Sequence, residues 1–277
     1  MYKYQKLITI WACILAPIIL GFVINKPLRR EMRDTAVTPH TLSQAADIRH
    51  ALEDFKKAYG GLPGDISDAE NRIPDCAGRD YCKIVSGTEN DGIIGREDFF
   101  NTLKPQVPVT VTLPAKTAAD ETVLFWAQLA ASGLIKTSFG SGIDIDFSDI
   151  VNGSAVALGK TNPPAKTGGG FIVGYANGAP LPLSLSPKNS GMKGTILVLM
   201  SDKALQGAVE LNAAGEQAIG PQRAVQIDRK GDDGRPDRGF IQAYGSPLCF
   251  QTNVGGEMDY NESVTSMECG LIINIEE

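Results

Sequence analysis

The longest apolar run of the chain comes at its start. It extends over residues 7–24 without a charged side chain, and basic residues flank both of its ends. A helix needs roughly 17–25 apolar residues to cross a bilayer. The pattern therefore predicts a transmembrane anchor over residues 1–25. The alternative is a signal peptide that is removed after export, whose apolar core is shorter, at roughly 7–15 residues.

Helical periodicity returns after a charged segment bounded by prolines, residues 26–40, which we interpret as a connector. Thr41 has the position of an N-cap, and Gln44 that of its capping-box partner. Gly60, Gly61 and Pro63 form a stop signal. Between them, apolar side chains recur on one helical face at Ala45, Ile48, Leu52, Phe55 and Tyr59. We expect a helix over residues 41–59 that packs this face within a globular domain, residues 41–277.

A second helical pattern covers Glu121–Ile135. Its apolar positions have helical spacing, and Gly133 is placed to cap its C-terminus. A tryptophan on such a stripe more often belongs to a core than to a ligand platform, so we expect Trp126 to be buried. The apolar positions are Val123, Trp126, Leu129 and Ala130.

Four later segments read as strands, because they are rich in β-branched residues and lie between glycine-rich turns. They are Phe171–Val173, Thr195–Met200, Phe240–Tyr244 and Gly270–Ile275. We expect them to form one antiparallel sheet. The fold class is then α+β: an N-terminal transmembrane helix, followed by a helix packed on an antiparallel sheet with long loops.

Cysteine spacing adds covalent constraints. Outside the predicted anchor the cysteines form two local pairs, Cys76 with Cys82 and Cys249 with Cys269. Such pairing predicts two disulfides, and hence an oxidising compartment such as the periplasm or the cell exterior. A zinc site is the alternative, although the pairs lack the two-residue spacing typical of zinc ligands.

Charge and composition limit the function classes. The 277 residues carry a net charge of −6, with no clustered basic face of the kind that nucleic-acid binding requires. The two histidines, His40 and His50, lie in the connector and the first helix, and no G-x-S-x-G motif occurs. We therefore expect no enzyme and no nucleic-acid partner.

Two acidic loops are candidates for Ca²⁺, which prefers hard oxygen ligands on glycine-containing loops. One gathers Asp228, Asp232, Asp233 and Asp237 around Gly234. The other has Asn90 and Asp91, with further acidic residues at positions 89, 97 and 98. Neither has EF-hand spacing. The alternative is that Asp-Asp-Gly and Asn-Asp-Gly simply form turns.

Three blocks together resemble type IV pilin-like proteins and pseudopilins. Residues 51–65, ALEDFKKAYGGLPGD, are similar to the block A-x-x-x-F-x-x-x-Y-x-x-L-P-G-D. Residues 121–135, ETVLFWAQLAASGLI, resemble the second block, a helix with a tryptophan. Residues 224–239, AVQIDRKGDDGRPDRG, resemble a turn of the form I-D-x-K-x-D-D-G-x-P-x-x-G. The resemblance implies an assembly and core motif of Phe55, Tyr59, Pro63, Gly64, Asp65 and Trp126.

The start of the chain departs from the family pattern. The apolar run lacks both the glycine of the prepilin cleavage site and the glutamate that follows it. Because that glutamate is thought to pair with a neighbouring subunit inside the membrane, its absence implies a filament tip or a static anchored protein.

The resemblance implies a non-catalytic subunit of a type II secretion or type IV pilus-type assembly, single-pass in the inner membrane with a periplasmic or extracellular domain. Its partners would be other pilin-like subunits and the inner-membrane assembly machinery. Since some pseudopilins bind calcium, Ca²⁺ is the cofactor to consider. The alternative is an anchored binding module that does not polymerise.

Overall fold

The computed structural model describes residues 38–78, 82, 90–95, 121–135, 158–159, 161–177, 192–205 and 208–276. The predicted anchor, residues 1–25, lies outside these ranges. Within them, no helix combines the length and the apolar character that crossing a bilayer requires.

The N-terminal helix is already formed at residue 38 and runs to residue 59, so it includes the last three residues of the predicted connector. The prediction of Thr41 as its N-cap is therefore wrong: Thr41 is a buried residue inside the helix. Gln44 is not a capping partner, because its Nε2 donates to the Pro164 carbonyl at 2.8 Å. The predicted stop is confirmed. Gly60 has a φ of 72° and its N–H donates to the Lys56 carbonyl at 2.9 Å.

A four-stranded antiparallel sheet forms the centre of the molecule, in the order β1-β2-β6-β3. Its strands are β1 (Gly170–Asn177), β2 (Lys193–Met200), β3 (Ile241–Gly245) and β6 (Cys269–Asn274). Val198 pairs with Ile172 on one side and Ile272 on the other. The predicted sheet is thus confirmed, with strand bounds within a few residues of those expected.

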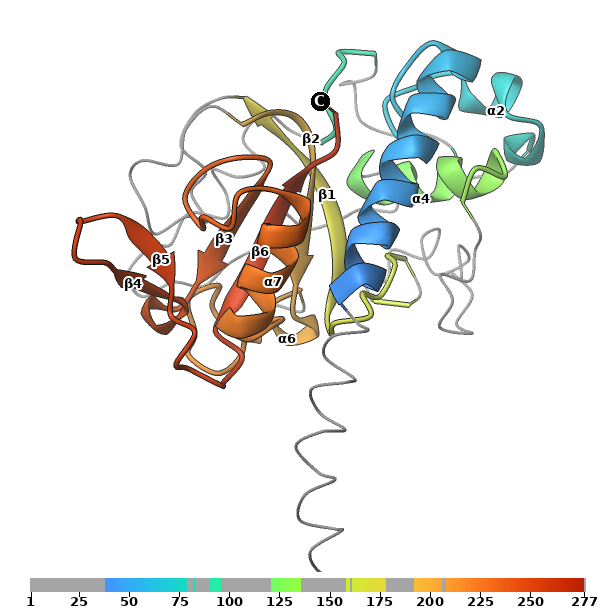
Figure 1. Cartoon of the computed structure of the whole chain (residues 1–277). Coiled ribbons are helices and arrows are strands. Elements are labelled where there is room, and N and C mark those ends of the chain that lie inside the picture. The colour runs from blue at the N-terminus through green and yellow to red at the C-terminus, as the bar shows by residue number, and fades with distance from the viewer. Residues whose placement is uncertain are drawn as a thin grey trace, which may run out of the picture.

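Both faces of the sheet are buried, which explains the continuous apolar runs of its strands. Leu197 and Leu199 of β2 face one core, whereas Ile196, Val198 and Met200 face the other. The first core is covered by the N-terminal helix and by α7 (Pro221–Gly231), which lie side by side across the sheet in Figure 1. The predicted apolar face of the N-terminal helix is confirmed: Ala45, Ile48, Leu52 and Phe55 are buried, and Tyr59 packs against them.

The second predicted helix is α4 (Glu121–Ala131), and it is buried on all sides from Glu121 to Leu129. The expected apolar stripe was too narrow, because α4 contributes to both cores. Trp126 packs in the first core and is completely buried, as predicted, and Val123 packs in the second. Gly133, at a φ of 71°, follows the helix end.

Short elements complete the described chain. The helices are α2 (Ala69–Arg72) and α6 (Asp202–Leu205), and the 3-10 turns are η1 (Pro74–Cys76) and η3 (Pro247–Cys249). A separate hairpin consists of β4 (Phe250–Thr252) and β5 (Met258–Tyr260). Figure 1 shows this hairpin on the far side of α7 from the N-terminal helix.

Both predicted disulfides are present. Cys76 is bonded to Cys82, with 5.5 Å between the Cα atoms, and Cys249 to Cys269, with 5.3 Å. The second bond joins η3 to the first residue of β6, so it ties the loop before the hairpin to the central sheet.

Candidate functional site

The third signature block folds as the second half of a helix and the loop that leaves it. The prediction of a turn over residues 224–239 is wrong for its first half, because α7 continues to Gly231. Pro221 at the first helical position was the available signal, since proline is favoured there. After the helix, Gly234 and Gly239 adopt positive φ angles of 77° and 82°, which favour glycine. We call residues 228–239 the aspartate loop.

Asp228 is the buried centre of the aspartate loop, with no exposed surface. Its Oδ2 accepts a hydrogen bond from the Tyr260 hydroxyl at 2.7 Å, and its Oδ1 accepts one from the Gly234 amide at 2.9 Å. Burial raises the pKa of Asp228 to about 7, an effect that these two hydrogen bonds partly oppose. Asp228 therefore joins α7, its own loop and strand β5 at one point.

Asp232 satisfies the outer edge of the sheet. Its Oδ2 accepts a hydrogen bond from the Ile241 amide of β3 at 2.9 Å, and the Pro236 carbonyl accepts one from the Ala243 amide at 2.8 Å. Both amides point away from β6, since residues 241 and 243 alternate with the β3 residues that bond to it. The aspartate loop thus occupies the hydrogen-bonding positions that a neighbouring strand would use.

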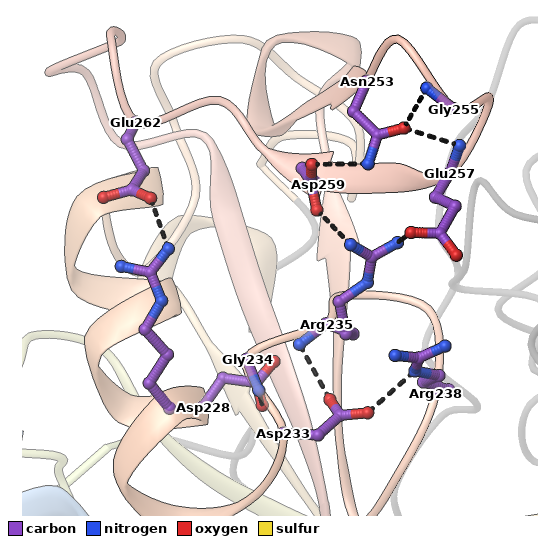
Figure 2. Close-up of polar contacts among 11 residues, drawn as sticks. Asp228, Asp233, Gly234, Arg235, Arg238, Asn253, Gly255, Glu257, Asp259 and Glu262 are labelled. Atoms are coloured by element: carbon purple, nitrogen blue, oxygen red, sulfur yellow. Dashed lines mark hydrogen bonds and ion pairs between the residues drawn. The ribbon is translucent and has the colours of Figure 1, made fainter.

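Arg235 clamps the β4–β5 hairpin onto the aspartate loop (Figure 2). Its Nη1 lies 2.6 Å from Asp259 Oδ1 and its Nη2 lies 2.9 Å from Glu257 Oε2, while only 16% of its side chain is exposed. Asp233 orients the loop around this arginine. It accepts hydrogen bonds from the Arg235 amide and from Arg238 Nε, each at 2.8 Å.

The predicted metal set is partly brought together. Asp228, Asp232 and Asp233 each place an oxygen within 4.8 Å of the others, which is close enough to share a cation. Asp237 is not part of this group. All three carboxylates already accept hydrogen bonds from the protein, although a carboxylate offers about four lone-pair sites and so retains some for a metal. Their present bonds give them a structural role, and Ca²⁺ remains a prediction.

The other acidic loop has a different geometry from the one expected of a cation site. Its backbone surrounds a carboxylate: Asp65 accepts hydrogen bonds from the amides of Asp91, at 3.1 Å, and Gly92, at 3.0 Å. The Asn90 amide donates to the Asp65 carbonyl at 2.8 Å, with Asn90 at a φ of 60°. Burial raises the pKa of Asp65, and the two amides oppose this effect. Positions 89, 97 and 98 lie outside the described residues.

Gly64 makes the closest approach in the same region. A Cβ atom at this position would lie 2.4 Å from the Glu121 carbonyl oxygen, and its φ is +91°. Its amide donates to Gln128 Oε1 of α4 at 2.7 Å. Pro63 is buried beside it, and the Phe55 and Tyr59 rings stack with centroids 4.6 Å apart. The L-P-G-D wording is therefore a joint that connects the N-terminal helix, α4 and the loop at 90–95.

Sequence reasoning missed the residues that attach the hairpin, namely Arg235, Glu257, Asp259 and Tyr260. Alternation in the short strands gave no signal for them, because their partners are distant in the chain. His40 and His50 are both exposed on the N-terminal helix.

Comparison of the chain with family models, curated proteins and solved structures gave no match.

Proposed function

We propose that this chain is a non-catalytic, pilin-like subunit of a type II secretion or type IV pilus-type assembly. Residues 1–25 anchor it in the inner membrane, and residues 41–277 form a domain in the periplasm or outside the cell. Its partners are other pilin-like subunits and the inner-membrane assembly machinery. The chain acts by contact rather than by catalysis.

The observation that carries this proposal is that the three blocks of the family resemblance occupy structural joints. The first block supplies the helix that covers the sheet and the Gly64 contact with α4. The second supplies Trp126 to the same core. The third forms the cover of the β3 edge. Residues that fix the fold at its joints are those that a shared architecture would require.

The two disulfides support the predicted location. Disulfides persist in oxidising compartments and are rare in the cytosol. A domain held outside the inner membrane by an N-terminal anchor meets this condition.

Photo-cross-linking of the full-length chain in membranes tests the proposal. A photoreactive residue at Asp54, on the exposed face of the N-terminal helix, should form adducts with pilin-like neighbours. The same residue at Lys203, on the surface helix α6, is the matched control. Adducts at Asp54 alone support a subunit that packs through this helix. Loss of the chain from the membrane fraction, or equal adducts at both positions, contradicts it.

A second candidate is an anchored module that binds Ca²⁺ without polymerising, and the grouping of Asp228, Asp232 and Asp233 favours it. Calorimetric titration of the full-length chain with Ca²⁺ tests this role. Binding that is lost in Asp233→Asn and kept in Asp237→Asn, which changes an aspartate outside the group, supports the module. No heat of binding at millimolar Ca²⁺ excludes it.

A further inference from the structure

The tip of the β4–β5 hairpin carries an exposed apolar side chain. Val254 is completely exposed, although it lies in a turn, where glycine, asparagine and aspartate are the usual residues. It follows Asn253 and precedes Gly255 and Gly256. The turn therefore presents one apolar group on a narrow support.

This turn is rigid. Asn253 Oδ1 accepts hydrogen bonds from the amides of Gly255, at 2.9 Å, and Glu257, at 3.0 Å. Asn253 Nδ2 donates to Asp259 Oδ2 at 3.0 Å, and Arg235 holds the other side of the hairpin, as Figure 2 shows. A partner that receives Val254 would have little conformational entropy to remove, which favours binding.

A groove of about 400 Å³ lies elsewhere on the molecule, between the N-terminal helix and the end of α7. Its apolar lining includes Leu42, Ala46 and Phe240, and the Phe240 side chain is 49% exposed. Arg49 and Lys230 add positive charge to it. The groove therefore suits an apolar side chain that has a carboxylate next to it.

The hairpin tip has that chemistry, because the Glu257 side chain, 57% exposed, lies in the same turn as Val254. The tip cannot fill the groove of its own molecule, since the hairpin and the N-terminal helix lie on opposite sides of α7 (Figure 1). We propose that Val254 of one copy inserts into this groove of a second copy, with Glu257 facing Arg49 and Lys230. Because tip and groove are different surfaces, the contact is head-to-tail and can be repeated along a row of copies.

This inference deepens the proposed function and rests on it, since anchored subunits supply the high local concentration that such a contact needs. The test uses the full-length chain in membranes with a photoreactive residue at Phe240, in the groove. We expect a ladder of cross-linked copies. Val254→Asp should reduce the multimers about tenfold, because a buried valine contributes of the order of one such factor.

Matched variants separate docking from folding. Thr252→Asp adds the same charge to an exposed position of the same hairpin and should keep the ladder. Ala46→Trp fills the groove and should abolish it, whereas Ala58→Trp, exposed on the same helix, should not. Co-expression of the Val254→Asp and Ala46→Trp chains should give cross-linked dimers but nothing longer, because one intact tip and one intact groove remain.

An unchanged ladder in Val254→Asp, or no dimer in the mixed membranes, would overturn the inference. The proposed function is measured separately by the adducts at Asp54. Loss of those adducts with a preserved Phe240 ladder would reject the pilin-like partners and keep the contact between copies.

Discussion

Gly64 is the residue with the least room around it. A methyl group would collide with the Glu121 carbonyl, and the φ of +91° disfavours any L side chain. We expect Gly64→Ala to lower the free energy of unfolding by about 3 kcal/mol or more, measured by urea denaturation of the full-length chain. Gly60→Ala is the control: it has a similar φ of +72° in open space, so it should cost only about 1–2 kcal/mol. Equal losses would show that the collision is relieved.

Asp228 should give the protein a specific pH dependence. Its pKa is about 7 in the folded state and near 3.8 when unfolded, so the folded state binds more protons between these values. Its contribution is therefore complete below about pH 4 and is lost as the pH rises through 7, by up to about 4 kcal/mol. Asp228→Asn should remove this slope when urea unfolding is measured from pH 4 to 8 in EDTA. A difference between wild type and variant that stays constant with pH would contradict the assignment.

Among the elements, the β4–β5 hairpin depends on a single arginine. Arg235 is mostly buried and pairs with both Asp259 and Glu257, so its removal leaves two carboxylates without their cation. We expect Arg235→Ala to cost about 2 kcal/mol and to accelerate hydrogen exchange in residues 250–260. Arg229→Ala breaks an exposed pair with Glu262 and should cost about 0.5 kcal/mol. If both variants exchange alike, Arg235 is not the clamp.

How much of each element could be predicted depended on the range of its contacts. Strand β2 was evident from Thr195–Met200 alone, because burial of both faces makes every side chain of the run apolar. Helix α7 was missed because its polar Arg-Lys-Gly-Asp-Asp end reads locally as a turn. The partners of Asp65 were not predictable, since its amides come from residues 26 and 27 positions away. The aspartate loop was identified as acidic, but its hydrogen bonds to β3 and β5 are tertiary contacts.

At the scale of the whole molecule, the two disulfides stabilise the fold to different extents. Cys249 and Cys269 are separated by 20 positions and Cys76 and Cys82 by 6. In the chain-entropy model the longer loop contributes about 3 kcal/mol and the shorter about 2 kcal/mol. We expect the Cys249→Ser/Cys269→Ser variant to melt at a lower temperature than the Cys76→Ser/Cys82→Ser variant in calorimetry. The reverse order would mean that losses in the native state outweigh loop entropy.

The covered edge of β3 has a consequence for crowded membranes. Unpaired strand edges are templates on which other chains add strands, and this is a common origin of aggregation. Asp232 and Pro236 already hold the outward amides of Ile241 and Ala243, so an incoming strand would first have to displace them. Copies concentrated by an anchor can therefore meet side chain to side chain without the risk that this edge of the sheet grows into an amyloid-like stack.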